Sequence, residues 1–288
     1  MIRRREFLIA SASAAVAGGI RAQQPGRATL DRIAIMSLCF SPVIKSAAHP
    51  DDPKRTLEIM DLPGMIAERY GVHHVEMQHS HFASTESGYL EQFRNRLQKA
   101  KSSMNQINVE FGPHNISAPD PVVRQETIDM TNKWVDYAVL LGCPRVMVNQ
   151  GTLAPDVRQA AIETLRTINA YAKPKQVFIT MENRGVGRAP TWQVVVEVIK
   201  ASGIFANPDI GNFADEESRA AGLRALYPLS SGSSHCHYDP ERYSEANAIR
   251  ISKEVGYKGL YSIEAAANNG PDPYVAVQTI LDELLKDI

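Results

Sequence analysis

Short apolar runs alternate with longer helical stretches from residue 31 onward, and this alternation occurs eight times. The runs are rich in β-branched and apolar residues, which favour strands. Gly71, Gly142, Gly203 and Gly256 stand between a helical stretch and the next run, where glycine commonly ends a helix. The predicted strands are residues 32–38, 73–77, 107–111, 145–149, 176–181, 204–208, 234–237 and 260–264.

Helical crossovers join parallel strands, so this pattern predicts an α/β fold with a parallel sheet. Eight units and the absence of a GxGxxG motif favour a single (β/α)8 TIM barrel over an open doubly wound sheet. The seventh run is the weakest, because SSGSSHCHYD (residues 230–239) is polar and small. We expect a short or distorted strand there.

The first residues differ in composition from the rest of the chain. Arg3, Arg4 and Arg5 precede Phe7, and an uncharged segment rich in Ala, Ser and Gly follows as far as Ile20. This order is typical of a signal peptide, and the adjacent arginines before Phe-Leu resemble a twin-arginine export signal. We expect residues 1–22 to be the signal peptide and residues 31–288 to form the barrel. The protein is then periplasmic or secreted.

Composition limits the classes of partner. Removing residues 1–22 takes four basic residues and one acidic residue from totals of 31 and 32, so the remaining chain has a net charge of −4. An acidic chain is not expected to bind nucleic acid, which needs clustered Lys and Arg. No later apolar run is long enough to span a bilayer, and no cysteine marks a lipid anchor. The expected partner is a small molecule; a homodimer is compatible with the fold, but no sequence feature specifies one.

Acidic and histidine residues stand where the last four predicted strands end. Glu182 and Glu264 lie at the ends of the fifth and eighth strands, Asp209 follows the sixth, and His235 lies in the seventh. The C-terminal ends of barrel strands meet at one mouth, where active sites are built. A carboxylate there is costly without a partner, and a cation supplies one. Three carboxylates and an imidazole suit Mn²⁺, Mg²⁺ or Co²⁺, and Zn²⁺ is compatible through the histidine.

The motifs around these residues resemble those of the xylose isomerase-like TIM barrel family. The similar segments are MENRG, NPDIGNF, HCH and YSIEA, together with IAIMSL and HVEMQ for the first two strands. This family includes sugar isomerases, ketose 3-epimerases, inositol-pathway enzymes and the apurinic endonuclease IV group. The resemblance implies that Glu182, Asp209, His235 and Glu264 bind one divalent metal.

Two positions leave the resemblance incomplete. His235 and His237 alternate along one strand and therefore share a face, so either could be the ligand. We prefer His235 as the ligand, with His237 near the substrate. Ketose 3-epimerases usually have a histidine three residues after the aspartate, where this chain has Asn212. The same replacement removes a ligand of the endonuclease IV cluster and disfavours phosphodiester cleavage.

The resemblance implies isomerisation or epimerisation of a sugar or keto-sugar by proton abstraction next to a carbonyl. Glu182 and Glu264 would remove and return the proton. One alternative is a metal-dependent lyase or hydrolase acting on an oxidised glycoside. Another is a secreted barrel that binds sugar without catalysis. The expected substrate-binding residues are Glu76, His79, His81, His114, Asn115, Gln150, Asn183, Arg184, Asn212 and His237.

Overall fold

The computed structural model describes residues 26–46, 48–184, 191–265 and 272–288. Eight parallel strands form one sheet in the order β6-β5-β4-β3-β2-β1-β8-β7. The strands are β1 (Ile33–Met36), β2 (His74–Gln78), β3 (Ser103–Val109), β4 (Arg145–Val148), β5 (Phe178–Glu182), β6 (Phe205–Asn207), β7 (Ser233–Cys236) and β8 (Leu260–Ile263).

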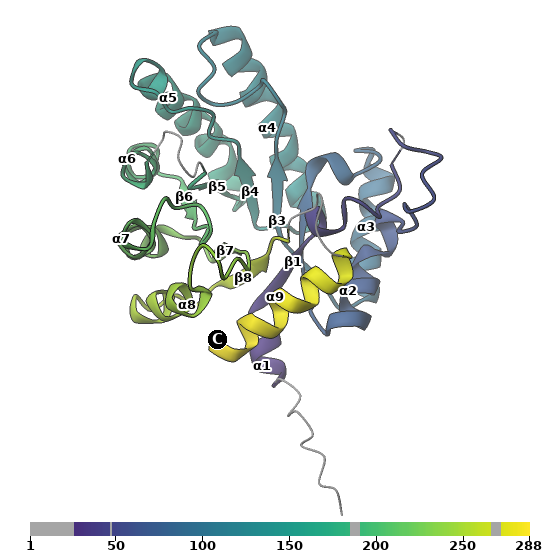
Figure 1. The fold of residues 1–288 in the computed structure, drawn as a ribbon. Coiled ribbons are helices and arrows are strands. Elements are labelled where there is room, and N and C mark those ends of the chain that lie inside the picture. The colour runs from purple at the N-terminus through teal and green to yellow at the C-terminus, as the bar shows by residue number, and fades with distance from the viewer. Residues whose placement is uncertain (1–25, 47, 185–190, 266–271) are drawn as a thin grey trace, which may run out of the picture.

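Helices surround the strands, as Figure 1 shows. Gly71 and Gly142 end α2 and α4 with φ angles of 67° and 69°, so the predicted helix ends are confirmed at these glycines. No helix in the described residues is both long and apolar enough to cross a membrane. The helices are α1 (Arg27–Leu30), α2 (Leu62–Tyr70), α3 (Ser87–Lys99), α4 (Pro121–Leu141), α5 (Pro155–Ala172), α6 (Trp192–Ser202), α7 (Glu216–Leu226), α8 (Glu245–Glu254) and α9 (Pro273–Asp287).

The two edge strands of the sheet, β6 and β7, meet through the segment that follows β6. The N–H of His235 donates to the carbonyl of Pro208 at 2.9 Å, and the N–H of Ile210 donates to the carbonyl of His235 at 3.2 Å. These bonds bring the ends of the sheet together into a barrel. The predicted (β/α)8 barrel is therefore confirmed, and the polar seventh run does form a strand. Residues 1–22 lie outside the described residues, so the signal peptide stays a prediction.

The interior of the barrel is polar. Hydrogen bonds cross it between strands that are not neighbours in the sheet: Asn105 of β3 donates to Ser233 of β7 at 2.9 Å, and Thr180 of β5 donates to Gln106 of β3 at 2.9 Å. Polar residues at the start of β3 explain why this strand begins at Ser103, earlier than the predicted residue 107. An apolar pattern does not reveal a strand whose inward side chains are amides.

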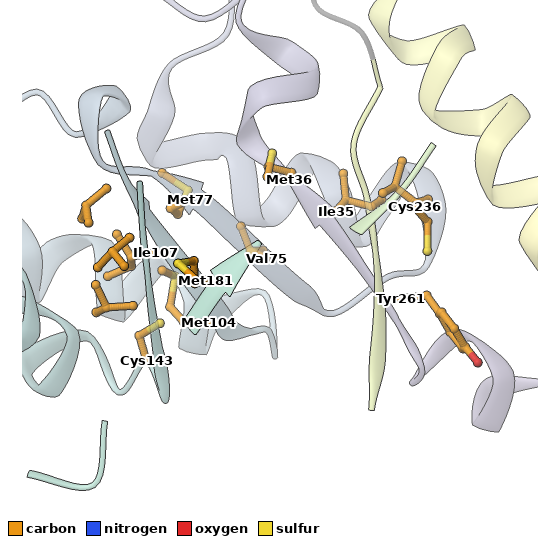
Figure 2. Packing of buried hydrophobic residues seen from close by; sticks show 14 of the residues in the cluster. Ile35, Met36, Val75, Met77, Met104, Ile107, Cys143, Met181, Cys236 and Tyr261 are labelled. Carbon is orange, nitrogen blue, oxygen red and sulfur yellow. The ribbon is translucent and has the colours of Figure 1, made fainter. Parts of the chain in front are cut away.

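The apolar core lies on the other face of the strands, against the helices. Ile35 of β1, Val75 of β2 and Met104 of β3 are successive register partners, and all three are buried. Figure 2 shows these side chains within the cluster of buried apolar residues. The burial of apolar surface that stabilises the fold is thus separated from the polar interior.

Candidate metal centre

Four side chains meet at the C-terminal ends of strands β5 to β8. Glu182 is the last residue of β5, Asp209 follows β6, His235 lies in β7, and Glu264 comes directly after β8. One ligand atom from each residue lies within 4.8 Å of the others. The arrangement agrees with the sequence expectation because parallel strands end at the same mouth of a barrel.

The hydrogen bonding of two buried atoms in this group indicates whether a cation fits. His235 Nδ1 and Glu264 Oε2 are both buried and lie 2.9 Å apart, and among the described residues neither has a partner in hydrogen-bond geometry. Buried polar atoms without a partner are costly. Both belong to the convergent set, and an imidazole with three carboxylates is a common donor set for divalent ions. The residues therefore fit a single divalent cation.

The side chains of Arg184 and Asn212 hold the carboxylate of Glu182 in place. Arg184 Nε donates to Glu182 Oε2 at 3.0 Å, and Asn212 Nδ2 donates to Glu182 Oε1 at 2.7 Å. Burial acts to raise the pKa of Glu182, but the charges of Arg184 and His235 lower it to about 2. Arg184 also pairs with Glu110, a partner that the sequence did not indicate. Glu182 is therefore ionised at neutral pH.

Asp209 has a different electrostatic environment. Burial raises its pKa to about 6, against the opposing effect of His237, whose Nε2 lies 2.8 Å from Asp209 Oδ2. Burial lowers the pKa of His237, but Asp209 reverses this effect and raises it to about 9. His237 thus pairs with one member of the group, while His235 Nδ1 belongs to the group itself. The two histidines thus have different positions, and their expected roles stay predictions.

Backbone and amide contacts fix the loop that carries Asp209. Asn183 Oδ1 accepts the N–H of Asp209 at 2.8 Å, and Asn183 Nδ2 donates to the carbonyl of Asp209 at 3.0 Å. Asn212 Nδ2 donates to Asp209 Oδ2 at 2.9 Å and so links it to Glu182. The amides of Asn183 and Asn212 thus orient the carboxylates, and their expected contact with substrate stays a prediction.

Glu76 lies deeper than its expected substrate-binding role requires. Its side chain is fully buried, and its Oε1 lies 2.7 Å from His235 Nε2. Burial acts to raise its pKa, but the charge and hydrogen bond of His235, together with hydrogen bonds from Ser262 and Asn108, lower the pKa overall. The contact is on the side of the imidazole ring opposite Nδ1. Glu76 therefore supports His235 from within the barrel and does not face the mouth.

The remaining expected substrate residues have other partners. The ring of His81 lies between Ser37 and Ser41, which follow β1, whereas His79 accepts the N–H of Glu110, which follows β3. His114 pairs with Glu126 of α4 at 2.9 Å, and Asn115 caps its own turn. Gln150 Nε2 donates to the carbonyl of Arg184. In the described part of the chain, none of these side chains hydrogen-bonds to the four residues of the group.

A cavity of about 360 Å³ opens beside the four convergent side chains. Glu264 and His237 line it, together with Asn212 and Arg242, while Ala265, Ala276 and Ile280 supply an apolar wall. Arg242 was not among the expected site residues, because an arginine at the start of a helix is usually solvated. The carboxylate of Glu264 thus lines a cavity that is large enough for a small organic molecule.

A family model described as the xylose isomerase-like TIM barrel matches residues 65–284. The chain belongs to this family. Among curated proteins, none matches the chain. The family assignment agrees with the resemblance that the strand-end motifs carry.

Several solved structures share the fold. The xylose isomerase domain protein from Planctomyces limnophilus has 14% identity and a TM-score of 0.66, over 88% of this chain and 95% of that chain. A D-allulose 3-epimerase from Methylomonas sp. has 13% identity and a TM-score of 0.70, over 89% and 98%. An L-ribulose 3-epimerase has 15% identity and a TM-score of 0.70, over 88% and 94%. At these identities the likeness concerns the fold.

Proposed function

We propose that this protein is a divalent-metal-dependent isomerase or epimerase that acts on a sugar or keto-sugar. The observation that carries the proposal is the convergence of four ligand atoms within 4.8 Å beside a cavity lined by one of the same carboxylates. The names of similar structures, which include allulose and ribulose 3-epimerases, support a carbohydrate substrate. Mn²⁺, Mg²⁺ or Co²⁺ suits the mostly oxygen donor set, and Zn²⁺ is compatible with it.

The two glutamates have positions suited to proton transfer. A bound divalent ion would polarise the substrate carbonyl and stabilise negative charge that develops next to it. Glu264 lines the cavity, so its carboxylate can accept a proton from a carbon of the substrate. Glu182 comes from β5, across the mouth from β8, and can return a proton on the other side. His237 and Arg242 line the cavity and are suited to bind hydroxyl oxygens.

The test begins with elemental analysis of the purified protein, followed by assays of keto-sugars with the ion that is found. We expect near-stoichiometric metal in the wild type, loss of metal in Asp209→Ala and His235→Ala, and formation of a product isomer of equal mass. Glu264→Gln should abolish turnover. The matched control is Glu91→Gln, an exposed glutamate of α3, which should retain full activity. A wild type that stays free of metal when Mn²⁺, Co²⁺ and Zn²⁺ are offered would contradict the proposal.

A second candidate, a lyase or hydrolase acting on an oxidised glycoside, is favoured by the apolar wall of the cavity. Ala265, Ala276 and Ile280 could contact an aglycone next to Glu264. Proton abstraction beside a ketone can also expel a leaving group, so the same carboxylate would serve. Mass spectrometry separates the two reactions, because a lyase or hydrolase releases a fragment and an isomerase does not. A protein that binds sugar but converts none of these substrates would instead be a non-catalytic binding barrel.

We also propose that the protein is exported through a twin-arginine route, on the basis of Arg4, Arg5, Phe7 and Leu8. The test is cell fractionation of the full chain and of a variant in which Arg4 and Arg5 are both lysine. The wild type should reach the periplasm and the variant should stay in the cytoplasm. Equal distribution of both proteins would contradict this route.

A further inference from the structure

Glu76 is a buried carboxylate with one charged partner among the described residues that contact it. It lies in the barrel interior on β2, and its Oε1 accepts from His235 Nε2 at 2.7 Å. Burying an ionised carboxylate is costly, and an apolar residue of similar volume is often as stable or more stable at such a position. Met36 of β1, the register partner of Glu76, is a buried apolar side chain at the neighbouring position. The stability of the fold therefore does not explain why a glutamate stands at position 76.

Three amides of β3 hold the carboxylate in one orientation. Asn105 donates to Glu76 Oε2 at 3.1 Å, while Gln106 and Asn108 donate to Oε1 at 3.1 and 2.8 Å. Consecutive residues of a regular strand point to opposite faces, so Asn105 and Gln106 could not normally both reach it. The register between β2 and β3 shifts between Val75 and Glu76, and this irregularity places both amides inside the barrel.

The contact with Glu76 fixes the orientation of the His235 ring. An imidazole has two nitrogens, and a bond at one fixes which nitrogen is free and where it points. Nε2 faces Glu76, so Nδ1 faces Glu264 and Glu182, at 2.9 and 3.7 Å. A ring rotated about χ2 would lose the contact to Glu76. The fixed carboxylate thus directs Nδ1 to the mouth of the barrel.

We propose that Glu76 is a positioning residue for the metal centre, and that the β3 amides hold it in place so that His235 presents Nδ1 to the ion. This role rests on the proposed metal-dependent function. Carboxylates that orient metal-binding histidines typically change metal affinity about 10- to 100-fold when mutated. Glu76 lies outside the set of ligand atoms and does not line the cavity, so its effect on substrate contacts is indirect.

The test is calorimetric titration of the metal-free full chain with Zn²⁺ and with Mn²⁺. Glu76→Gln keeps the size of the side chain and the oxygen acceptor but removes the charge, and it should weaken ion binding about 10- to 100-fold. Asn108→Ala removes one donor to Glu76 and should weaken binding by a smaller factor. Thr131→Val is the matched control, because Thr131 is fully buried in α4 and its hydroxyl donates to the carbonyl of Thr127 in the same helix. It should lower stability without changing the affinity for the ion.

A second measurement separates positioning from general stability. In the Zn²⁺-loaded protein labelled with ¹⁵N-histidine, the wild type should show His235 with its proton on Nε2, and Glu76→Gln should broaden or shift this signal. If Glu76→Gln binds ions as tightly as wild type while His235→Ala does not bind, the role of Glu76 is overturned and the metal centre stands. If the wild type binds no ion, the proposed function is overturned, and the role of Glu76 with it.

Discussion

The affinity of the centre for a divalent ion should fall steeply as the pH is lowered from 7 to 5. A metal ligand must be deprotonated, so protons compete with the ion. Two groups set this competition. Burial, together with the negative charge of Glu182, raises the pKa of Asp209 to about 6. Burial acts to lower the pKa of His235, but Glu76 and Glu264 raise it well above the ordinary value, so its ring carries a proton throughout this range.

The magnitude follows from counting these protons. Because Asp209 and Glu182 interact, the value of about 6 is an apparent pKa of the pair. A group with that pKa is about nine-tenths deprotonated at pH 7 and about one-tenth at pH 5, which gives roughly a tenfold loss of affinity. Displacing one proton from His235 adds about tenfold per pH unit, or roughly 100-fold. The expected total is about 1000-fold.

Calorimetric titration with Mn²⁺ at pH 5, 6 and 7, in buffers of different ionisation enthalpy, measures both the affinity and the protons released. We expect release of about one proton at pH 7 and about two at pH 5. His114→Asn is the control, since His114 pairs with Glu126 outside the centre and its loss should leave the pH dependence unchanged. An affinity that changes less than about tenfold between pH 5 and 7, with no proton released at pH 7, would refute the assignment of His235 as a ligand.

Three further predictions concern stability. The pKa of Glu245 is raised from 4.5 to about 8 by burial and by Glu283 and Asp287, so its contribution to stability is complete below about pH 4.5 and is lost as the pH rises through about 8. In urea denaturation, Glu245→Gln should exceed wild type by about 2–4 kcal/mol at pH 8.5 and equal it at pH 4. Arg219 is buried and donates to the carbonyl of Ile210 at 2.7 Å, so Arg219→Met should lower the free energy of unfolding by about 2–4 kcal/mol. A Cβ at Gly222 would lie 2.3 Å from Phe213, and Gly222→Ala should cost about 1–3 kcal/mol in the same assay.

The elements that position the site were accessible from sequence because their signals are local. Apolar runs and helix-ending glycines mark the strands and helices, and in a parallel barrel every strand end reaches the same mouth. The residues at the strand ends therefore placed Glu182, Asp209 and Glu264 at one mouth with either His235 or His237, and the family resemblance indicated the set that the structure brings together. The polar seventh strand was recoverable only because its neighbours required it.

The partners of individual side chains were not accessible in this way. His114 follows a strand and was among the expected substrate-binding residues; in the structure it pairs with Glu126, which is twelve residues further along in α4. Asn183 and Asn212 carry the right chemistry to bind hydroxyls, yet their amides hold Asp209. Such choices depend on the loop conformation and on side-chain rotamers, which no residue pattern specifies.

The polar interior accounts for both the late predicted start of β3 and the position of the centre. Asn105, Gln106 and Asn108 hide the first half of β3 from an apolar pattern, and the same three amides hold Glu76 behind His235. Stability comes instead from the apolar layer between strands and helices, which leaves the inward face free to carry charge. An ion present at 100 times its dissociation constant would return about 2.7 kcal/mol to the folded state. Substitutions of the inward polar residues should therefore change the free energy of unfolding little. The same substitutions should change the affinity for the ion strongly.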